Sequence, residues 1–137
     1  MAATILLDTS VLIELLRSAA SIQSARLART PADTAVVLSS IVAAELEEGF
    51  AASRRGATAR TRFNALAEQL ERRPFDFGAA HRYGQLRQPL RTRGRSIGPF
   101  DELVAAHALE LGASLATLDV EDFSRVDGLR VEDWRAP

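Results

Sequence analysis

Four acidic residues that are far apart in the sequence fall at positions where a parallel sheet would bring them together. Asp8 ends the first apolar stretch of the chain, and Asp119 follows a later one. Glu45 lies one and a half turns into the helix expected after a second apolar stretch, and Asp101 lies near the start of another helix. Ligands of open parallel sheets bind outside the carboxyl ends of the strands. We therefore expect these four carboxylates to converge at one edge of the sheet.

Carboxylates that converge in this way repel one another unless a cation lies among them. The chain has no cysteine, and the expected ligands are hard oxygen atoms, which favour Mg²⁺ or Mn²⁺ over zinc. A cation of this kind lowers the pKa of water and screens the charge of a scissile phosphate. The pattern therefore predicts metal-dependent phosphodiester hydrolysis. The expected catalytic residues, which are also the expected metal ligands, are Asp8, Glu45, Asp101 and Asp119.

Each of these acids also has an interpretation that involves no chemistry. Asp8 could cap a helix, and Asp119 could belong to a turn. Glu45 could be a solvated acid, and Asp101 could be favoured by the dipole of its helix. Coincidence explains the four positions poorly when all of them fall at the same edge of a sheet.

Several other residues are candidates for accessory roles. Thr9, Ser10 and Thr117 could each offer a hydroxyl group to a bound water molecule, although the first two could instead cap a helix. Asp122 could be an outer ligand of the cation. His107 lies in an alanine-rich helix, and we interpret it as a packed core residue without a catalytic role.

The alternation of short apolar stretches with longer amphipathic segments predicts an α/β fold. We expect a three-layer sandwich, with a central, mostly parallel sheet of four or five strands and helices on both faces. The expected strands cover residues 3–7, 35–38, 114–118 and 128–133. The expected helices cover residues 10–16, 21–29, 40–48, 55–72, 78–93 and 99–111. We expect Gly49 to end or bend one of these helices and Pro89 to kink or split another.

Length and composition limit the kinds of protein that this chain can be. Its 137 residues suffice for one ordinary domain, so we expect a single domain over residues 1–137. Hydrophobic residues make up 47% and charged residues 26%, which is the balance of a folded globular protein. No apolar run reaches the roughly 20 residues of a membrane span, and no signal-peptide pattern follows Met1. We therefore expect no membrane association and, given the lack of cysteine, a cytoplasmic protein.

Five arginines occur between residues 78 and 99 without an intervening acid, although the formal net charge of the whole chain is -1. A basic strip beside an acidic cluster could hold a phosphate chain next to a cation. We expect the phosphates that flank the scissile bond to be bound by Arg87, Arg91, Arg93 and Arg95. The alternative is that this strip is simply a solvated helix face.

Segments of the sequence, in order and over nearly the whole chain, resemble the motifs of PIN domains. Leu7–Glu14 (LDTSVLIE) is similar to their opening motif, and Ser39–Leu46 (SSIVAAEL) is similar to their second. Ile97–Leu109 is similar to the third motif. Leu115–Asp119 and Val126–Trp134 resemble the C-terminal portion of VapC-type toxins in particular. No single segment is specific to this family, whereas the whole set of segments in this order is.

This resemblance implies a PIN fold and the activity of an Mg²⁺- or Mn²⁺-dependent endoribonuclease. It implies that the metal is carried by Asp8, Glu45, Asp101 and Asp119. It also implies a homodimer, and neutralisation by a VapB-type antitoxin whose C-terminal segment packs along the toxin and covers the active site. A toxin of this type hydrolyses RNA phosphodiester bonds and inhibits translation, and we expect products with a 5′ phosphate and a 3′ hydroxyl.

Other functions are open or are disfavoured by particular residues. A non-catalytic RNA- or protein-binding module of PIN fold is one alternative, and a nuclease acting on DNA is another. A haloacid-dehalogenase-like hydrolase would need an aspartate at the position of Ser10, and a receiver domain would need a lysine, which this chain lacks. A P-loop or dinucleotide-binding fold would need a glycine-rich turn after the first strand, and residues 8–11 contain no glycine.

Overall fold

The computed structural model describes residues 3–137 and contains one five-stranded sheet. The strands are β1 (Thr4–Leu7), β2 (Ala35–Ser39), β3 (Glu71–Arg73), β4 (Ser114–Thr117) and β5 (Val131–Asp133). Their order in the sheet is β3-β2-β1-β4-β5, and all four neighbouring pairs are parallel. The prediction of a parallel sheet of four or five strands is therefore confirmed. The single domain predicted for the chain also includes Met1 and Ala2, which lie outside the described residues.

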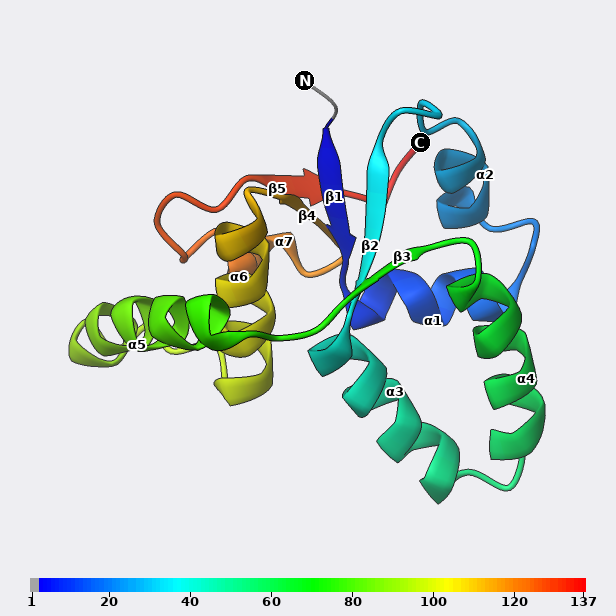
Figure 1. The fold of residues 1–137 in the computed structure, drawn as a ribbon, viewed down its shortest axis with the longest axis horizontal. Helices are drawn as coiled ribbons and strands as arrows, with labels where there is room; N and C mark the ends of the chain where they lie inside the picture. Colours follow the sequence, from blue (N-terminus) through cyan, green and yellow to red (C-terminus); the bar gives the residue numbers. More distant parts are fainter. Residues whose placement is uncertain (1–2) are drawn as a thin grey trace.

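Seven helices connect and cover these strands in the described part of the chain. They are α1 (Thr9–Arg17), α2 (Ile22–Ala28), α3 (Ser40–Ala52), α4 (Gly56–Ala67), α5 (Phe77–Thr92), α6 (Pro99–Leu111) and α7 (Val120–Phe123). Figure 1 shows α5 and α6 on one side of the sheet and α1, α2 and α4 on the other, which is the predicted three-layer arrangement. Within residues 3–137, no helix combines the length and apolarity that crossing a membrane would require.

The central strands are apolar on both faces, which is why helices must cover the sheet on both sides. Leu6 and Leu115 are fully buried, and Leu6 aligns with Val37 on β2 and with Leu115 on β4. The hydrogen-bond ladder continues one residue past β1, where the Asp8 amide donates to the Ala116 carbonyl at 2.9 Å. The sheet thus fixes the backbone of Asp8 at its carboxyl edge.

One predicted helix is shorter than its sequence pattern indicates. The helix expected over residues 55–72 ends as α4 at Ala67, and the chain then forms the edge strand β3. All three residues of this strand, Glu71, Arg72 and Arg73, are exposed. Because none of them packs into the core, the strand leaves no apolar alternation in the sequence, and its pairing with β2 depends on the backbone.

Gly49 does not end its helix and Pro89 does not split its helix, whereas a bend or a kink at these residues stays a prediction. α3 continues past Gly49 to Ala52, and α5 continues past Pro89 to Thr92. A glycine inside a helix costs only about 0.5–1 kcal/mol, which the packing of α3 offsets. Pro89 is exposed and lies in the last turn of α5, so water can reach the carbonyl group that loses its amide partner.

Side chains cap helices α3 and α5, and a glycine ends α6. Ser39 Oγ accepts a hydrogen bond from the Ile41 amide at 3.1 Å, and Asp76 Oδ1 accepts one from the Ala79 amide at 2.9 Å. Gly112 ends α6 with a φ of 64°, a left-handed conformation that favours glycine. The cap at Ser39 places the first turn of α3 directly at the carboxyl end of β2.

Candidate active site

Asp8 is held by two hydroxyl groups that come from separate segments of the chain. Ser10 Oγ on α1 and Thr117 Oγ1 on β4 donate to Asp8 Oδ2 at 2.9 and 2.8 Å. Each hydroxyl oxygen also accepts a hydrogen bond from a backbone amide of the loop after β4. The Leu118 amide donates to Ser10 Oγ at 3.1 Å, and the Asp119 amide donates to Thr117 Oγ1 at 2.9 Å. Since each amide fixes the direction in which its hydroxyl donates, the network orients Asp8 together with this loop.

The carboxylate of Asp8 is buried and carries a raised pKa. The residue is only 5% exposed, and this burial raises the pKa above its usual value of 3.8. The hydroxyl groups of Thr117 and Ser10 act in the opposite direction, and the negative charge of Glu45 raises the pKa further. Both hydroxyl bonds end on Oδ2, so Oδ1 is the atom that could hold a cation.

Asp101 enters the cluster from the first turn of α6. This helix begins at Pro99, and the preceding Gly98 has a φ of 99°, which a side chain would strain. The carboxylates of Asp101, Asp119 and Asp122 each offer one oxygen, and these oxygens lie within 4.8 Å of one another. Three oxygen ligands at this spacing could share one cation.

The pKa of Asp101 reports how closely the acids gather. Burial raises this pKa first, followed by the negative charges of four neighbours, and the result is a value of about 7. These neighbours are, in order of effect, Asp8, Glu45, Asp119 and Asp122. Asp8, Glu45 and Asp119 therefore lie near enough to Asp101 for their charges to raise its pKa, as does Asp122, the candidate outer ligand.

The donor set fits a hard divalent cation. Burial and the neighbouring Asp122 also raise the pKa of Asp119, so Asp8, Asp101 and Asp119 all resist ionisation when no cation is present. Among the described residues, none of these three carboxylates forms an ion pair with an arginine. Clustered carboxylate oxygens without a basic partner are the ligands that Mg²⁺ and similar ions prefer.

Comparison with known proteins identifies the family. The PIN domain family matches residues 5–129 of the chain. Ribonuclease VapC1 of Haemophilus influenzae is 30% identical over 129 residues, which cover 94% of this chain and 96% of that protein. The chain belongs to the VapC ribonucleases of the PIN-domain family.

Two further similarities support this assignment. The crystal structure of VapBC2 from Rickettsia felis, bound to a DNA fragment from its promoter, contains a chain that superposes with a TM-score of 0.90. That chain is 27% identical, and the match covers 96% of this chain and 98% of that one. The tRNA(fMet)-specific endonuclease VapC of Shigella flexneri is 45% identical over 60 residues, but the alignment spans only 44% of this chain and 46% of that protein. The predicted PIN fold and VapC resemblance are confirmed.

The accessory groups of this VapC site differ in part from those expected. Ser10 and Thr117 contact Asp8, whereas Thr9 Oγ1 is buried and has no hydrogen-bond partner among the described residues. Asp122, expected as an outer ligand, lies within the group of oxygens that could share a cation. Sequence alone could not show whether Thr9 or Ser10 contacts Asp8, because this depends on the conformation of the first turn of α1.

The four arginines predicted to bind phosphates do not gather at one point. Arg87 forms an ion pair with the buried Glu102, and Arg93 pairs with an exposed acid in the connection between α7 and β5. The side chains of Arg91 and Arg95 are exposed. A role for these arginines in phosphate binding stays a prediction, and Arg87 is the one that already has a buried partner.

Glu102 is a buried acid that the sequence reasoning missed. It is 0% exposed, it pairs with Arg87, and Ser96 Oγ lies 3.4 Å from each of its carboxylate oxygens. Since Glu102 follows Asp101 in the first turn of α6, this ion pair ties α5 and the α5–α6 connection to the turn that carries Asp101. Helical spacing from the buried Ala105 could have placed Glu102 on the inner face of the helix.

His107 has a structural environment in this VapC fold, in agreement with the interpretation from sequence. Its Nδ1 lies 2.8 Å from Ser39 Oγ, and its ring packs edge-on against Phe75 with a centroid distance of 5.6 Å. Burial lowers the pKa of His107 below its usual value, which favours the neutral ring. The residue therefore links α6 to the end of β2.

Proposed function

We propose that this chain is a divalent-metal-dependent endoribonuclease and the toxin of a VapBC-type toxin–antitoxin pair. The observation that carries the proposal is the cluster of Asp101, Asp119 and Asp122, whose oxygens lie within 4.8 Å of one another, beside Asp8 and Glu45, whose charges raise the pKa of Asp101. Among the described residues, Asp8, Asp101 and Asp119 form no ion pair with a basic side chain that would offset their repulsion. Membership of the VapC ribonucleases supports RNA as the substrate.

Each acid has a distinct task in the proposed site. We assign the cation to Asp8, Glu45, Asp101 and Asp119, with Asp122 as an additional ligand. When bound, Mg²⁺ or Mn²⁺ would lower the pKa of water and screen the charge of the scissile phosphate. Ser10 and Thr117 orient Asp8 through Oδ2, and an Asp101 carboxyl group with a pKa of about 7 would exchange its proton for the cation.

We also propose that the single domain of residues 1–137 acts in the cytoplasm, as a homodimer neutralised by a VapB-type antitoxin. The similarity to a chain of the VapBC2 structure from Rickettsia felis supports a VapB-type partner. Co-expression with a VapB-type antitoxin, followed by size-exclusion chromatography with light scattering, tests both associations. A stable monomer that does not bind the antitoxin would contradict this part of the proposal.

Cleavage of a defined RNA tests the activity. Because one relative is named a tRNA(fMet)-specific endonuclease, tRNA(fMet) is the first substrate to try, beside a DNA strand of the same sequence. Purified chain is incubated with Mn²⁺, with Mg²⁺ or with EDTA. Asp8→Asn and Asp101→Asn each remove one charge from the cluster, whereas the matched control Asp33→Asn removes an exposed acid between α2 and β2.

We expect cleavage of RNA only when a divalent cation is present. The two cluster variants should lose more activity than the roughly 10–100-fold that removal of an outer-shell partner costs, and the control should keep full activity. The products should end in a 5′ phosphate and a 3′ hydroxyl. Cleavage in EDTA, or products with a 2′,3′-cyclic phosphate, would contradict the proposed chemistry, and preferential cleavage of DNA would contradict the proposed substrate.

A further inference from the structure

A cleft with an apolar floor lies between α5, α6 and the connection from α7 to β5. Its volume is about 190 Å³. The floor is formed by Leu86 and Leu90 of α5, Leu109 of α6, and Val126 of the connection. Leu90 and Val126 are almost fully buried, whereas Leu86 and Leu109 are half-buried and so offer apolar surface to a ligand. We call this space the α5–α6 cleft.

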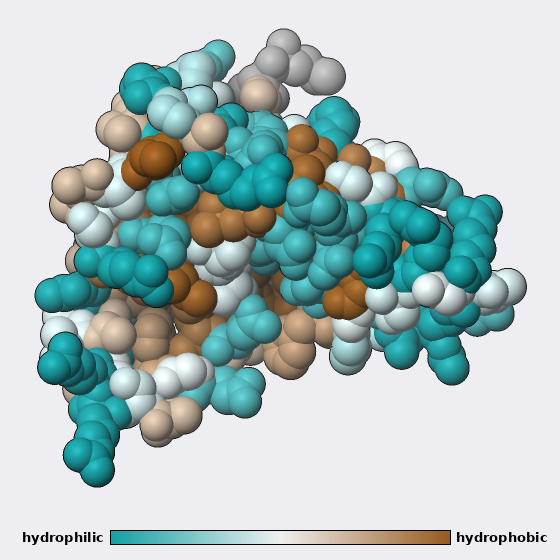
Figure 2. Space-filling view, turned by 180° about the vertical axis from the view of Figure 1, so that it is seen from behind, coloured by the Kyte–Doolittle hydropathy of each residue, from teal (hydrophilic) through white to brown (hydrophobic). Residues whose placement is uncertain are grey.

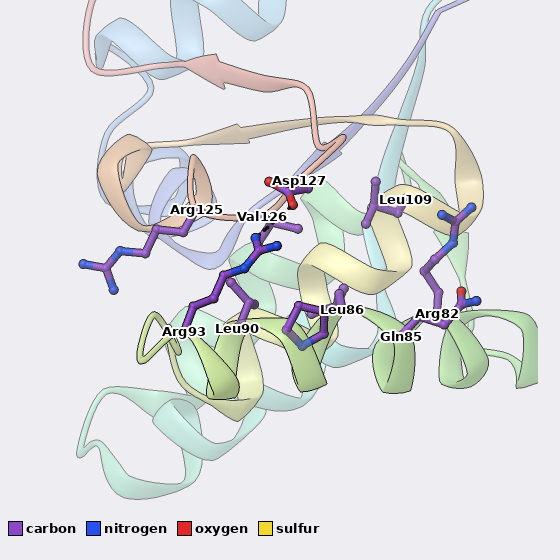
Figure 3. A pocket seen from close by; sticks show the side chains of 10 residues that line it. Arg82, Gln85, Leu86, Leu90, Arg93, Leu109, Arg125, Val126 and Asp127 are labelled. Carbon is purple, nitrogen blue, oxygen red and sulfur yellow. Dashed lines mark hydrogen bonds and ion pairs between the residues drawn. The ribbon is translucent and has the colours of Figure 1, made fainter.

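The rim of the α5–α6 cleft is basic. It carries Arg82, Arg93 and Arg125, against a single acid, Asp127. In Figure 3, Arg93 reaches toward Asp127 on one side of the cleft and Arg82 stands at the other end, with Leu86 between them. The cleft therefore combines an excess of positive charge with an apolar base.

Asp127, the one acid on the rim, forms only a weak ion pair with Arg93. Arg93 and Asp127 are 3.4 Å apart, and their side chains are 63% and 89% exposed. An ion pair between two side chains so open to water contributes little to stability. Arg93 can therefore exchange Asp127 for a phosphate group, which offers more acceptor oxygens and more charge.

Arg125 contacts both the cleft and the acidic cluster. Arg125 lines the cleft, and its guanidinium group lies 3.5 Å from Asp122. The carboxylate of Asp122 in turn shares the group of oxygens formed with Asp101 and Asp119. In Figure 3 the side chain of Arg125 points away from the other lining residues, so Arg125 separates the cleft from the acids.

We propose that the α5–α6 cleft is a subsite for one nucleotide of the RNA strand beside the scissile bond. The phosphate groups that flank this nucleotide lie against Arg93 and Arg82, and its base or ribose covers the floor formed by Leu86 and Leu109. Such a pairing of a basic rim with a flat apolar contact is how proteins hold single-stranded nucleic acid. This inference rests on the proposed ribonuclease function and specifies where the substrate continues beyond the metal site.

Charge and size favour this occupant over others. A duplex presents its bases stacked inside, so it cannot place one of them on the floor of a cleft of about 190 Å³. Figure 2 shows that the end of the molecule formed by α5 is mostly hydrophilic on the face seen from behind, unlike the apolar centre of a protein interface. An acidic segment of a protein partner is the competing occupant, and the test below separates it from RNA.

The salt dependence of RNA binding tests the subsite directly. Binding of a fluorescein-labelled single-stranded RNA is followed by fluorescence anisotropy in EDTA, so that no cleavage occurs, across a series of salt concentrations. Each phosphate contact that is lost lowers the slope of log K against log salt by about 0.7, or about 5-fold in affinity per tenfold change in salt. We expect this decrease for Arg93→Gln, and about twice the decrease for the double variant with Arg82→Gln.

A variant with the opposite expected effect makes the test sharper. Asp127→Asn removes the acid that competes for Arg93, so it should bind RNA more tightly than the wild type. Arg54→Gln and Asp33→Asn remove the same charges from exposed positions on other connections, and they control for the change in net charge. All of these side chains are exposed, so thermal unfolding should be unchanged within error. In cleavage assays with Mn²⁺, Arg93→Gln and the double variant should raise KM, Asp127→Asn should lower it, and kcat should stay the same in all three.

The outcomes separate the subsite from the proposed function. If the wild type cleaves RNA but Arg93→Gln, Asp127→Asn and their controls bind RNA alike, the subsite is wrong and the ribonuclease proposal stands. If the cleft variants lose affinity for the antitoxin and keep their affinity for RNA, the cleft is a protein-docking site and the inference is also wrong. If the wild type neither binds nor cleaves any RNA, both proposals fall together.

Discussion

Replacing Asp101 by asparagine should stabilise the metal-free protein at neutral and alkaline pH, although it removes a residue that we assign to the active site. A carboxyl group whose pKa is higher in the folded than in the unfolded chain binds its proton more tightly when the chain is folded. The stability it contributes is present below the unfolded pKa of 3.8 and is lost as the pH rises to about 7. Above that pH, the folded protein carries the full repulsion of the cluster.

The size of the effect follows from this shift. Raising a pKa from 3.8 to about 7 corresponds to at most about 4 kcal/mol, at roughly 1.4 kcal/mol per pH unit. The substitution also removes a negative charge from the first turn of α6, which costs about 0.3–1 kcal/mol of favourable helix-dipole interaction. Burial of the ionised carboxylate and repulsion from its neighbours together exceed this loss. We therefore expect a net gain on the order of 1–3 kcal/mol at pH 8, and a midpoint of unfolding that is several degrees higher.

Thermal and urea unfolding in EDTA at a series of pH values from 4 to 8 would measure this gain. The difference between Asp101→Asn and wild type should grow with pH and level off near pH 8, while Asp33→Asn should show no such trend. Burial of His107 makes the opposite contribution below pH 6.5, but both proteins contain this residue, so its effect cancels in the difference. Equal stability of the two proteins at pH 8, or a difference independent of pH, would refute the electrostatic account of the site.

Three other predictions concern the groups around the cluster. Thr117→Val removes the hydroxyl that donates to Asp8, and it should lower stability by about 1–3 kcal/mol in urea unfolding and weaken Mn²⁺ binding in calorimetry. Glu102→Gln breaks the pair with Arg87, and it should lower stability by about 3 kcal/mol, toward the low end for a buried pair because Arg87 can still reach water. The pKa of the buried His107 ring, followed by NMR, should lie below 6.5, and a value above 6.5 would contradict its burial as a neutral group.

Sequence patterns were sufficient to predict the core of the fold and the gathering of the acids. Apolar stretches that end in Asp8 or precede Asp119 indicate buried parallel strands, and chain topology then dictates that their carboxyl ends share an edge. β3 was not predicted because its three residues are exposed and show no hydrophobic pattern. The strand forms because β2 offers an unpaired edge. The continuation of α5 through Pro89 likewise depends on water reaching that part of the helix, which sequence does not reveal.

The groups that position the acids were much harder to predict than the acids themselves. Ser10 and Thr117 are separated by 107 residues, and their contact with Asp8 depends on the pairing of β1 with β4 and on the first turn of α1. Glu102 lies beside Asp101, yet its partner Arg87 was interpreted as a phosphate ligand. The sequence gives the sign of the charge on a helical residue, but it does not give the direction in which the side chain points. Positioning contacts of this kind arise only in three dimensions.

These positioning contacts limit how far the acids of the cluster can move apart. Repulsion among the acids could be relieved by moving them apart, but β1, β4 and the ion pair of Glu102 with Arg87 fix the backbone on which Asp8 and Asp101 stand. Ser10 and Thr117 further hold the side chain of Asp8. With movement limited, a carboxyl group responds by retaining its proton, and burial together with the neighbouring charges raises the pKa of Asp101 to about 7. A site built in this way gives up a proton to receive a cation and needs little rearrangement to do so.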